Sequence, residues 1–242
     1  MNFVLTYLKF SVKKIYLEIF IIISQKLMEV PGGSSRKIVV TLYETIGTAL
    51  FVYGILVSGG NAIGVPVALL ACIFIFGGIT GGHFNPAVSI GVWCTTENKA
   101  ANAVFLLMIM IGQFIGAFIG VGLSFLSLYL VSNGELFIET PPYACPGDVV
   151  KKDGAETLEC DNTDGKGFHY EFQAIYTQVI CTFIFVSVIL MVKDKATAPT
   201  SDGVLGALTV VLTLAGIIQV ASKLGPVFNP AVSIAFVTLD VW

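Results

Sequence analysis

The chain has 242 residues, of which 55% are hydrophobic and 12% are charged, and its formal net charge is −3. Soluble domains carry about a quarter charged residues, so this composition argues against a soluble enzyme and favours a protein whose surface faces lipid. The net charge says nothing about a nucleic-acid partner, but the sequence shows no basic patch or stacking motif, so we expect no such partner. The sequence shows no Ser-His-Asp set, metal-ligand cluster or phosphate-binding loop, so we expect no enzyme activity, no metal and no cofactor.

Residues 1–37 form an N-terminal segment that we expect to lie outside the membrane-spanning part. Its apolar stretch, Tyr16–Ser24, is far shorter than the about 20 residues that a bilayer requires. Lysines flank this stretch and no small-residue cleavage site follows it, which argues against a signal peptide. The pattern favours a basic amphipathic helix on the cytoplasmic surface.

The rest of the chain, residues 38–242, contains apolar windows that are typical of membrane spans. Two shorter apolar pieces, Val88–Trp93 and Val232–Leu239, reach only about halfway across at about 1.5 Å per residue. The predicted spans are Ile38–Ser58, Gly64–Gly78, Ala103–Val131, Phe172–Val192 and Val204–Ala221.

Lysine and arginine are concentrated in residues 1–37, which places that segment on the cytoplasmic side. Counting spans then places the acidic loop 132–171 outside and the Lys193–Asp202 loop inside. The outer loop contains Cys145 and Cys160. We expect these two to form a disulfide, which for such a loop stabilises by about 3 kcal/mol; two free surface thiols are the alternative.

One short sequence, Asn-Pro-Ala-Val-Ser, occurs twice, at Asn85–Ser89 and at Asn229–Ser233. Asparagine is a favoured N-cap and proline fits the first helical position, so each copy predicts a helix that begins inside apolar sequence. Two such helix starts predict two broken helices that meet within a membrane and border a pore. The candidate pore residues are Asn85, Pro86, Ala87, Asn229, Pro230 and Ala231.

The two copies belong to an internal repeat, in which the segment Glu44–Thr48 of the first half matches Gln178–Thr182 of the second. Each half, about 38–131 and 172–242, is expected to contain spans and one half-helix. An odd number of spans inverts the second copy, so the two half-helices approach the midplane from opposite sides. The chain ends at Trp242 without a third span for the second half. We expect a fragment; the alternative is a protein that departs from its own repeat.

At these residues the chain resembles the aquaporin (major intrinsic protein) family. The resemblance covers about Ile38 to Val237 and rests on Gly81–Val88, the second Asn-Pro-Ala, the Glu-x-x-Gly-Thr opening and the long outer loop. It implies an all-α membrane protein, with an inverted repeat of tilted spans and two re-entrant half-helices, from which the last span is missing. It also implies a homotetramer with one pore per subunit, surrounded by membrane lipid, in the plasma membrane or an internal vacuolar membrane.

The expected function is passive conduction of water, and of small uncharged solutes such as glycerol or urea, with exclusion of protons and ions. Each half-helix carries roughly +0.5 charge at its N-terminus, and Asn85 and Asn229 offer N–H donors to a passing solute. The alternative is that these asparagines cap helices and have no role in conduction. The rival functions are a non-conducting structural membrane protein and a secondary transporter, which would need paired coupling acids.

The resemblance implies supporting roles for three further residues. Glu44 corresponds to a glutamate that accepts hydrogen bonds from the re-entrant loop; the alternative is a carboxylate that reaches the membrane surface. Gln178 is its neutral counterpart, whose side-chain carbonyl can still accept. His83 corresponds to the loop histidine of the family, for which we expect a structural role and keep a pH sensor as the alternative.

The resemblance also implies a selectivity ring, which counting from the Asn-Pro-Ala sequences places at Val65, Ile217, Pro226 and Val232. All four are apolar, and Val232 stands where the family usually has arginine. A wider opening favours larger neutral solutes, whereas an apolar ring is poorly wetted. Ser233, where glycerol-conducting relatives tend to carry aspartate, favours a water-type pore. Water conduction with some solute leakage is the resulting prediction.

Overall fold

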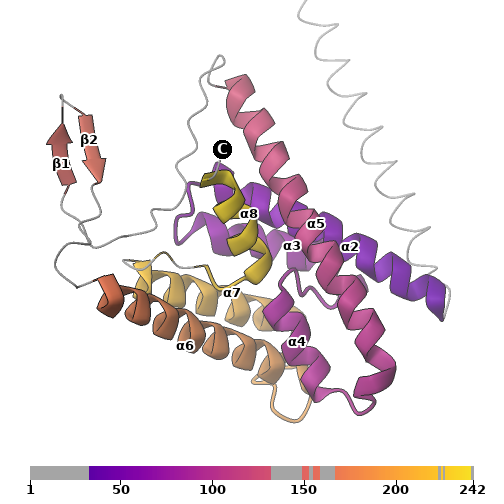
Figure 1. Ribbon diagram of the computed structural model, residues 1–242. Helices are drawn as coiled ribbons and strands as arrows, with labels where there is room; N and C mark the ends of the chain where they lie inside the picture. The colour runs from indigo at the N-terminus through magenta and orange to yellow at the C-terminus, as the bar shows by residue number, and fades with distance from the viewer. Residues whose placement is uncertain are drawn as a thin grey trace, which may run out of the picture. The chain divides into compact units, whose positions relative to one another are not determined.

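The computed structural model describes residues 33–131, 149–152, 155–158, 167–222, 225 and 227–240. Within these residues the chain is built of helices, apart from one small hairpin (Figure 1). The helices are α2 (Ser34–Val57), α3 (Gly64–Thr80), α4 (Pro86–Thr95), α5 (Lys99–Val131), α6 (Gly167–Lys193), α7 (Gly203–Val220) and α8 (Pro230–Asp240). Four contain stretches long and apolar enough to cross a membrane: Ser34–Val57, Lys99–Val131, Phe172–Lys193 and Gly203–Val220. The expected helical membrane fold is confirmed.

The helices extend beyond several of the apolar windows. Helix α5 begins at Lys99, in the polar residues before Ala103, and α6 begins at Gly167 rather than Phe172. Backbone hydrogen bonds continue until a cap or a breaker stops them, whatever the polarity of the side chains. The two half-helices begin at Pro86 and Pro230, each directly after its asparagine.

The hairpin was not expected from the sequence. Strands β1 (Val149–Lys152) and β2 (Ala155–Leu158) pair antiparallel, with Val149 opposite Leu158. The strands contain β-branched residues, and the dipeptide between them is Asp-Gly, which favours tight hairpins. Several predictions fall outside the described residues: the surface helix around Tyr16–Ser24, the Cys145–Cys160 disulfide and the ring residue Pro226.

Helix α5 lies close against α2, because glycines on α5 face the backbone of α2. A Cβ atom added at Gly116 or Gly120 would collide with the carbonyl oxygens of Thr45 or Ala49. Small residues at a four-residue step permit this close approach between helices in membranes. Helix α5 also packs against both half-helices, α4 and α8, so it supports the centre of the fold.

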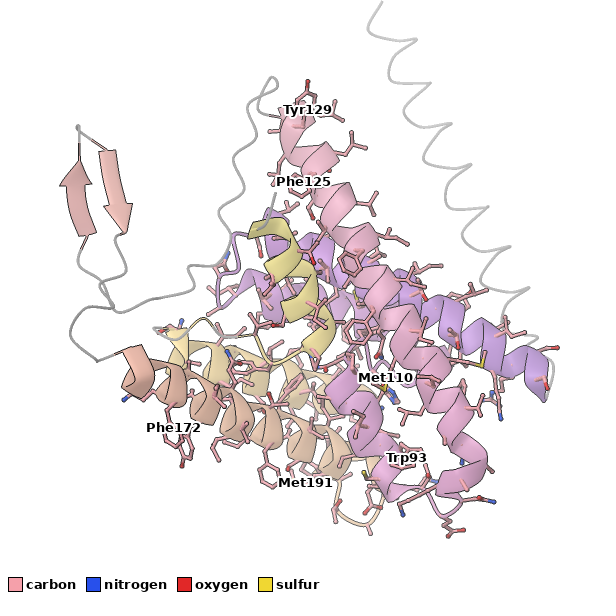
Figure 2. The ribbon with its side chains drawn as sticks, viewed as in Figure 1. Trp93, Met110, Phe125, Tyr129, Phe172 and Met191 are labelled. Atoms are coloured by element: carbon pink, nitrogen blue, oxygen red, sulfur yellow. The ribbon has the colours of Figure 1, made fainter. Side chains whose placement is uncertain are left out.

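The first turns of the half-helices are largely buried, whereas the spans present apolar side chains outward. Phe84 and Val88, at the start of α4, and Phe236 of α8 are almost fully buried. In Figure 2 the labelled side chains Phe172 and Met191 point away from the neighbouring helices, and both are exposed. An outer surface of this kind suits contact with lipid tails rather than water.

Candidate pore

The two half-helices begin beside each other and are joined by a reciprocal pair of hydrogen bonds. Asn85 caps α4, because its side-chain oxygen accepts from the N–H of Ala87 at 2.8 Å; Asn229 accepts from Ala231 at 3.1 Å. Each asparagine also donates across to the other loop. Nδ2 of Asn85 donates to the Phe228 carbonyl at 2.9 Å, and Nδ2 of Asn229 donates to the Phe84 carbonyl at 2.8 Å.

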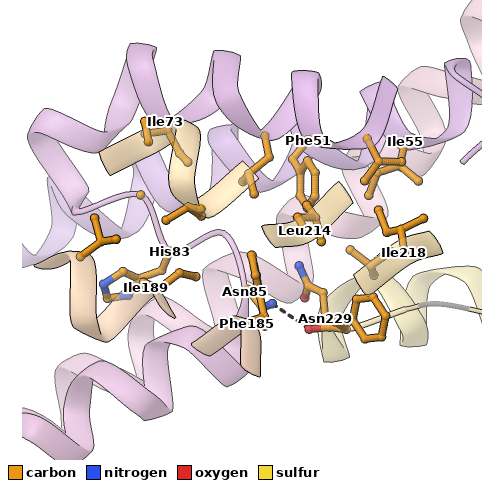
Figure 3. Close-up of a pocket in the computed structure, with 18 of the residues that line it drawn as sticks. Phe51, Ile55, Ile73, His83, Asn85, Phe185, Ile189, Leu214, Ile218 and Asn229 are labelled. Atoms are coloured by element: carbon orange, nitrogen blue, oxygen red, sulfur yellow. Dashed lines mark hydrogen bonds between the residues drawn. The ribbon is translucent and has the colours of Figure 1, made fainter. Parts of the chain in front are cut away.

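Both asparagines border one cavity of about 460 Å³. Figure 3 shows them near each other on its wall, between side chains that come from both halves. A side-chain amide has two N–H groups, and the cross bond uses one of them. Each asparagine therefore keeps one donor with which it can meet a solute.

The cavity follows the helices from one connecting loop to another. Along α7 it is lined from Gly203 to Gln219, roughly 24 Å at 1.5 Å per residue. One end, here called the α2–α3 mouth, is lined by Gly59–Ala62, Gln219 and Ser222. The other, the α6–α7 mouth, is lined by Gly81–His83, Lys193 and Thr200–Gly203.

Between its mouths the cavity has a mainly apolar wall built by equivalent positions of the repeat. Phe51 and Ile55 of α2 face it from one half, and Phe185 and Ile189 of α6 from the other (Figure 3). A solute that passes the asparagines therefore meets few hydrogen-bonding partners elsewhere.

Glu44 is completely buried and holds the first re-entrant loop. Its Oε1 accepts from the backbone N–H of His83 at 3.0 Å, and its Oε2 accepts from the N–H of Phe84 at 2.7 Å. The loop N–H groups have no helical partner at this point, so the carboxylate satisfies donors that would otherwise be buried alone.

Gln113 and Ser89 complete this network, although the sequence analysis did not single them out. Nε2 of Gln113 donates to Glu44 at 2.8 Å and to Ser89 at 2.9 Å, and Nδ1 of His83 lies 3.1 Å from the Ser89 hydroxyl. Because Gln113 uses the hydroxyl as an acceptor, the hydroxyl proton is available for His83. The signal that could have revealed Gln113 is its polar side chain within the long apolar window.

Gln178 makes a different contact from the one expected of it. Its Nε2 donates to the Gly225 carbonyl, whereas its Oε1 is buried and has no hydrogen-bond partner within the described residues. The expectation was a loop-bracing residue whose carbonyl oxygen can accept; Gln178 does contact the second loop, but as a donor. An amide can present either end, and here the second loop turns a carbonyl toward it, so the amide donates.

The predicted ring residues are only partly brought together. Val65 and Val232 line the cavity, but Ile217 is buried elsewhere, and its neighbour Ile218 lines the cavity instead. Successive residues of a helix lie about 100° apart around its axis, so an offset of one residue changes which side chain faces the cavity. Counting back from Asn229 across the loop to α7 therefore selected Ile217, one position before the residue that lines the cavity.

Lys193 is a pore-lining residue that the sequence analysis placed only in a loop. Its Nζ donates to the carbonyl of Gly81 at 2.7 Å, at the α6–α7 mouth. Its position at the end of an apolar window was the available signal. In the described part of the chain, no three His, Cys, Asp or Glu side chains gather in a way that could hold a metal ion.

Comparison with known proteins agrees with this geometry. Residues 39–240 match the family described as Major intrinsic protein. Aquaporin Z of Photorhabdus laumondii is 26% identical over 202 residues, which cover 81% of this chain and 79% of that protein. Glycerol uptake facilitator protein-like 6 of Lactiplantibacillus plantarum is 30% identical over 206 residues, 80% of each chain. Aquaporin-4 of Mus musculus is 35% identical over 115 residues, 46% of this chain and 29% of that protein.

Members of this family are channels, and the relatives support a channel for water or small solutes in place of an enzyme. The match extends over most of the chain and includes both half-helices, Pro86–Thr95 and Pro230–Asp240. The chain therefore belongs to the major intrinsic protein family and is an integral membrane protein.

Proposed function

We propose that this chain is a passive water channel that also leaks small uncharged solutes, such as glycerol or urea, and excludes protons and ions. The observation that carries the proposal is the pair Asn85 and Asn229, which face one cavity and hold each other through the carbonyls of Phe228 and Phe84. A cavity open along the spans, with two donors at its centre, suits solutes that carry an oxygen acceptor.

Exclusion of protons and cations follows from the direction of the half-helices. Each presents its N-terminus, with roughly +0.5 charge, to the region of the asparagines. Two such ends raise the energy of a cation there. A water whose oxygen accepts from both Asn85 and Asn229 has no lone pair left to accept a hydrogen bond from a neighbouring water, so the continuous wire that protons would need is interrupted at this point.

The apolar lining supports mixed selectivity. Val65, Ile218 and Val232 line the cavity without a charge or a strong donor, so the pore has little means to reject a neutral solute by hydrogen bonding. The named relatives include both an aquaporin and a glycerol uptake facilitator. Their names therefore favour neither water alone nor glycerol alone.

Glu44 and Gln178 act in this proposal as positioning residues, and His83 as a structural one. The two carboxylate oxygens of Glu44 are occupied by His83, Phe84 and Gln113. An acid held in this way is poorly suited to carry a coupling ion, which argues against a secondary transporter.

The chain is further proposed to form a homotetramer in the plasma membrane or an internal vacuolar membrane, with residues 1–37 on the cytoplasmic side. The family resemblance supports the tetramer, and the lysines of the N-terminal segment support the orientation. Accessibility of a single N-terminal epitope tag in intact and permeabilised cells tests the orientation.

Stopped-flow light scattering on proteoliposomes that contain the full chain tests the function. We expect osmotic shrinkage well above that of empty vesicles, without a proton or sodium gradient, and a slower glycerol-driven reswelling. Shrinkage no faster than in empty vesicles would favour the rival, a non-conducting structural membrane protein.

Val232→Arg tests the ring on the same apparatus. The long side chain would narrow the cavity beside Val65, so glycerol flux should fall while water conduction persists. Glycerol flux equal to that of the wild type would contradict the place we assign to Val232.

A further inference from the structure

The charged side chains of the cavity are all at one end. Among the described lining residues, Lys193 and Asp202 carry a formal charge, and both lie at the α6–α7 mouth. The polar side chains that the structure describes at the α2–α3 mouth are neutral, namely Asn61, Gln219 and Ser222. Among the described lining residues, fixed charge therefore lies at the α6–α7 mouth, away from Val65 and Val232.

Lys193 is held at this mouth by the re-entrant loop. Its Nζ donates to the Gly81 carbonyl at 2.7 Å. A Cβ atom added at Gly81 would lie 3.3 Å from that Nζ and 3.4 Å from Nε2 of His83, so both nitrogens face the same small space. An ammonium has three N–H groups, and the bond to Gly81 uses one of them.

Asp202 does not occupy the same position. Its Oδ1 accepts from the N–H groups of Val204 and Leu205, at 2.7 and 3.0 Å, so the carboxylate caps α7. The positive end of that helix offsets part of its charge. Lys193 lies instead against Gly81, four residues before Asn85, on the loop that leads to the centre of the pore.

We propose that Lys193 is a specificity-determining residue of this channel, whose fixed positive charge rejects small cations at the α6–α7 mouth and admits neutral solutes of the same size. The inference rests on the proposed channel function. Lys193 is exposed at this mouth, so water screens its charge, which still acts on a solute that enters within about 10 Å of it. The ring residues Val65 and Val232, which also line the cavity, carry no charge.

Guanidinium and urea provide a direct test, because they are nearly the same in shape and differ in charge. The full chain in proteoliposomes is compared with Lys193→Gln, which keeps an N–H donor for Gly81 but removes the charge. We expect guanidinium entry, normalised to water permeability, to rise about tenfold in this variant, while normalised urea entry changes less than about twofold. Lys193→Arg, which keeps the charge, should return the wild-type ratio.

Lys195→Gln is the matched control, since Lys195 is exposed in the same loop and does not line the cavity. It should leave guanidinium entry unchanged. If Lys193 served only to brace the loop, Lys193→Gln would resemble the wild type and Lys193→Met would lose water conduction, which would overturn the inference. An equal rise in guanidinium entry for Lys195→Gln would overturn it too. Absence of water conduction in the wild type would instead overturn the proposed function.

Discussion

The two re-entrant loops place their asparagines in the same geometry, but different side chains hold the two loops. The first loop is held by the carboxylate of Glu44, which accepts from the N–H groups of His83 and Phe84. In the second, the amide of Gln178 donates to the carbonyl of Gly225, and its oxygen is left without a partner in the described residues. The two halves therefore share the helix starts and their cross bonds, whereas the side-chain contacts that brace the two loops differ.

The first loop also contains a closely packed residue with an unusual backbone conformation. Phe84 has a φ of 46°, the one positive value outside glycine in the described chain, and its ring lies against Gly47. At the position equivalent to Gly47, the second half has Cys181, which is buried. A strained residue persists only where its surroundings determine it strongly, so the contacts around Phe84, including Gly47, must hold the first loop firmly.

Loss of the carboxylate should have the largest effect. Glu44→Ala leaves the N–H groups of His83 and Phe84 and the amide of Gln113 without their acceptor, and each buried unsatisfied group costs about 1–3 kcal/mol. We expect a loss of at least about 3 kcal/mol of unfolding free energy, measured by denaturation in detergent micelles. Glu44→Gln keeps one accepting oxygen and should lose less; equal losses would contradict the account of two accepted N–H groups.

Gly47→Ala should come next. The added methyl group would collide with the Phe84 ring, and overpacking of a core typically costs about 1–3 kcal/mol. Gly122→Ala on α5, where a Cβ meets nothing within 4 Å, is the control and should be neutral or stabilising. A Gly47→Ala protein as stable as this control would show that the contact between Gly47 and the Phe84 ring does not confine the first loop.

The asparagines test whether the two halves are equivalent at the centre. Asn85→Ala and Asn229→Ala each remove one cap, worth about 1 kcal/mol, and one cross bond, worth about 1 kcal/mol. We therefore expect equal losses of about 2 kcal/mol in the same denaturation assay. A difference of more than about 1 kcal/mol would mean that the two asparagines contribute unequally to the free energy of unfolding, although their hydrogen bonds are equivalent in the structure.

Gln178→Leu should have the smallest effect. The change loses the bond to Gly225, worth about 1 kcal/mol, but also removes the unpartnered oxygen, which offsets part of that loss. We expect a decrease of about 1 kcal/mol or less. A loss as large as that of Glu44→Ala would remove the contrast between the loops.

The helices and the two capped starts were predictable because local rules determine them. Apolar length predicts α5 and α7, and Asn-Pro predicts the starts of α4 and α8. Contacts between residues far apart in the sequence were harder to predict. The bonds of Gln113 to Glu44 and of Lys193 to Gly81 join residues 69 and 112 positions apart, and no local pattern connects such pairs.

The contact of Gln178 and the position of Ile217 differ from the expected ones for a common reason. Both predictions carried a position through a loop by counting, from the first half to the second or from Asn229 back to α7. Loop length and backbone orientation are set by tertiary packing, so a carbonyl faces Gln178 where an N–H was expected, and Ile218 faces the cavity in place of Ile217.

The cross bonds also constrain the order in which the protein can be completed during synthesis. Asn85 and the carbonyl it donates to are 143 residues apart, and Asn229 and its acceptor are 145 apart. When the first half leaves the ribosome, its capped helix start therefore has no partner to donate to until the second half has been inserted. The centre of the fold is therefore completed late in synthesis. A chain stalled between the two halves would carry the buried Asn85 amide without the carbonyl to which it donates in the complete structure.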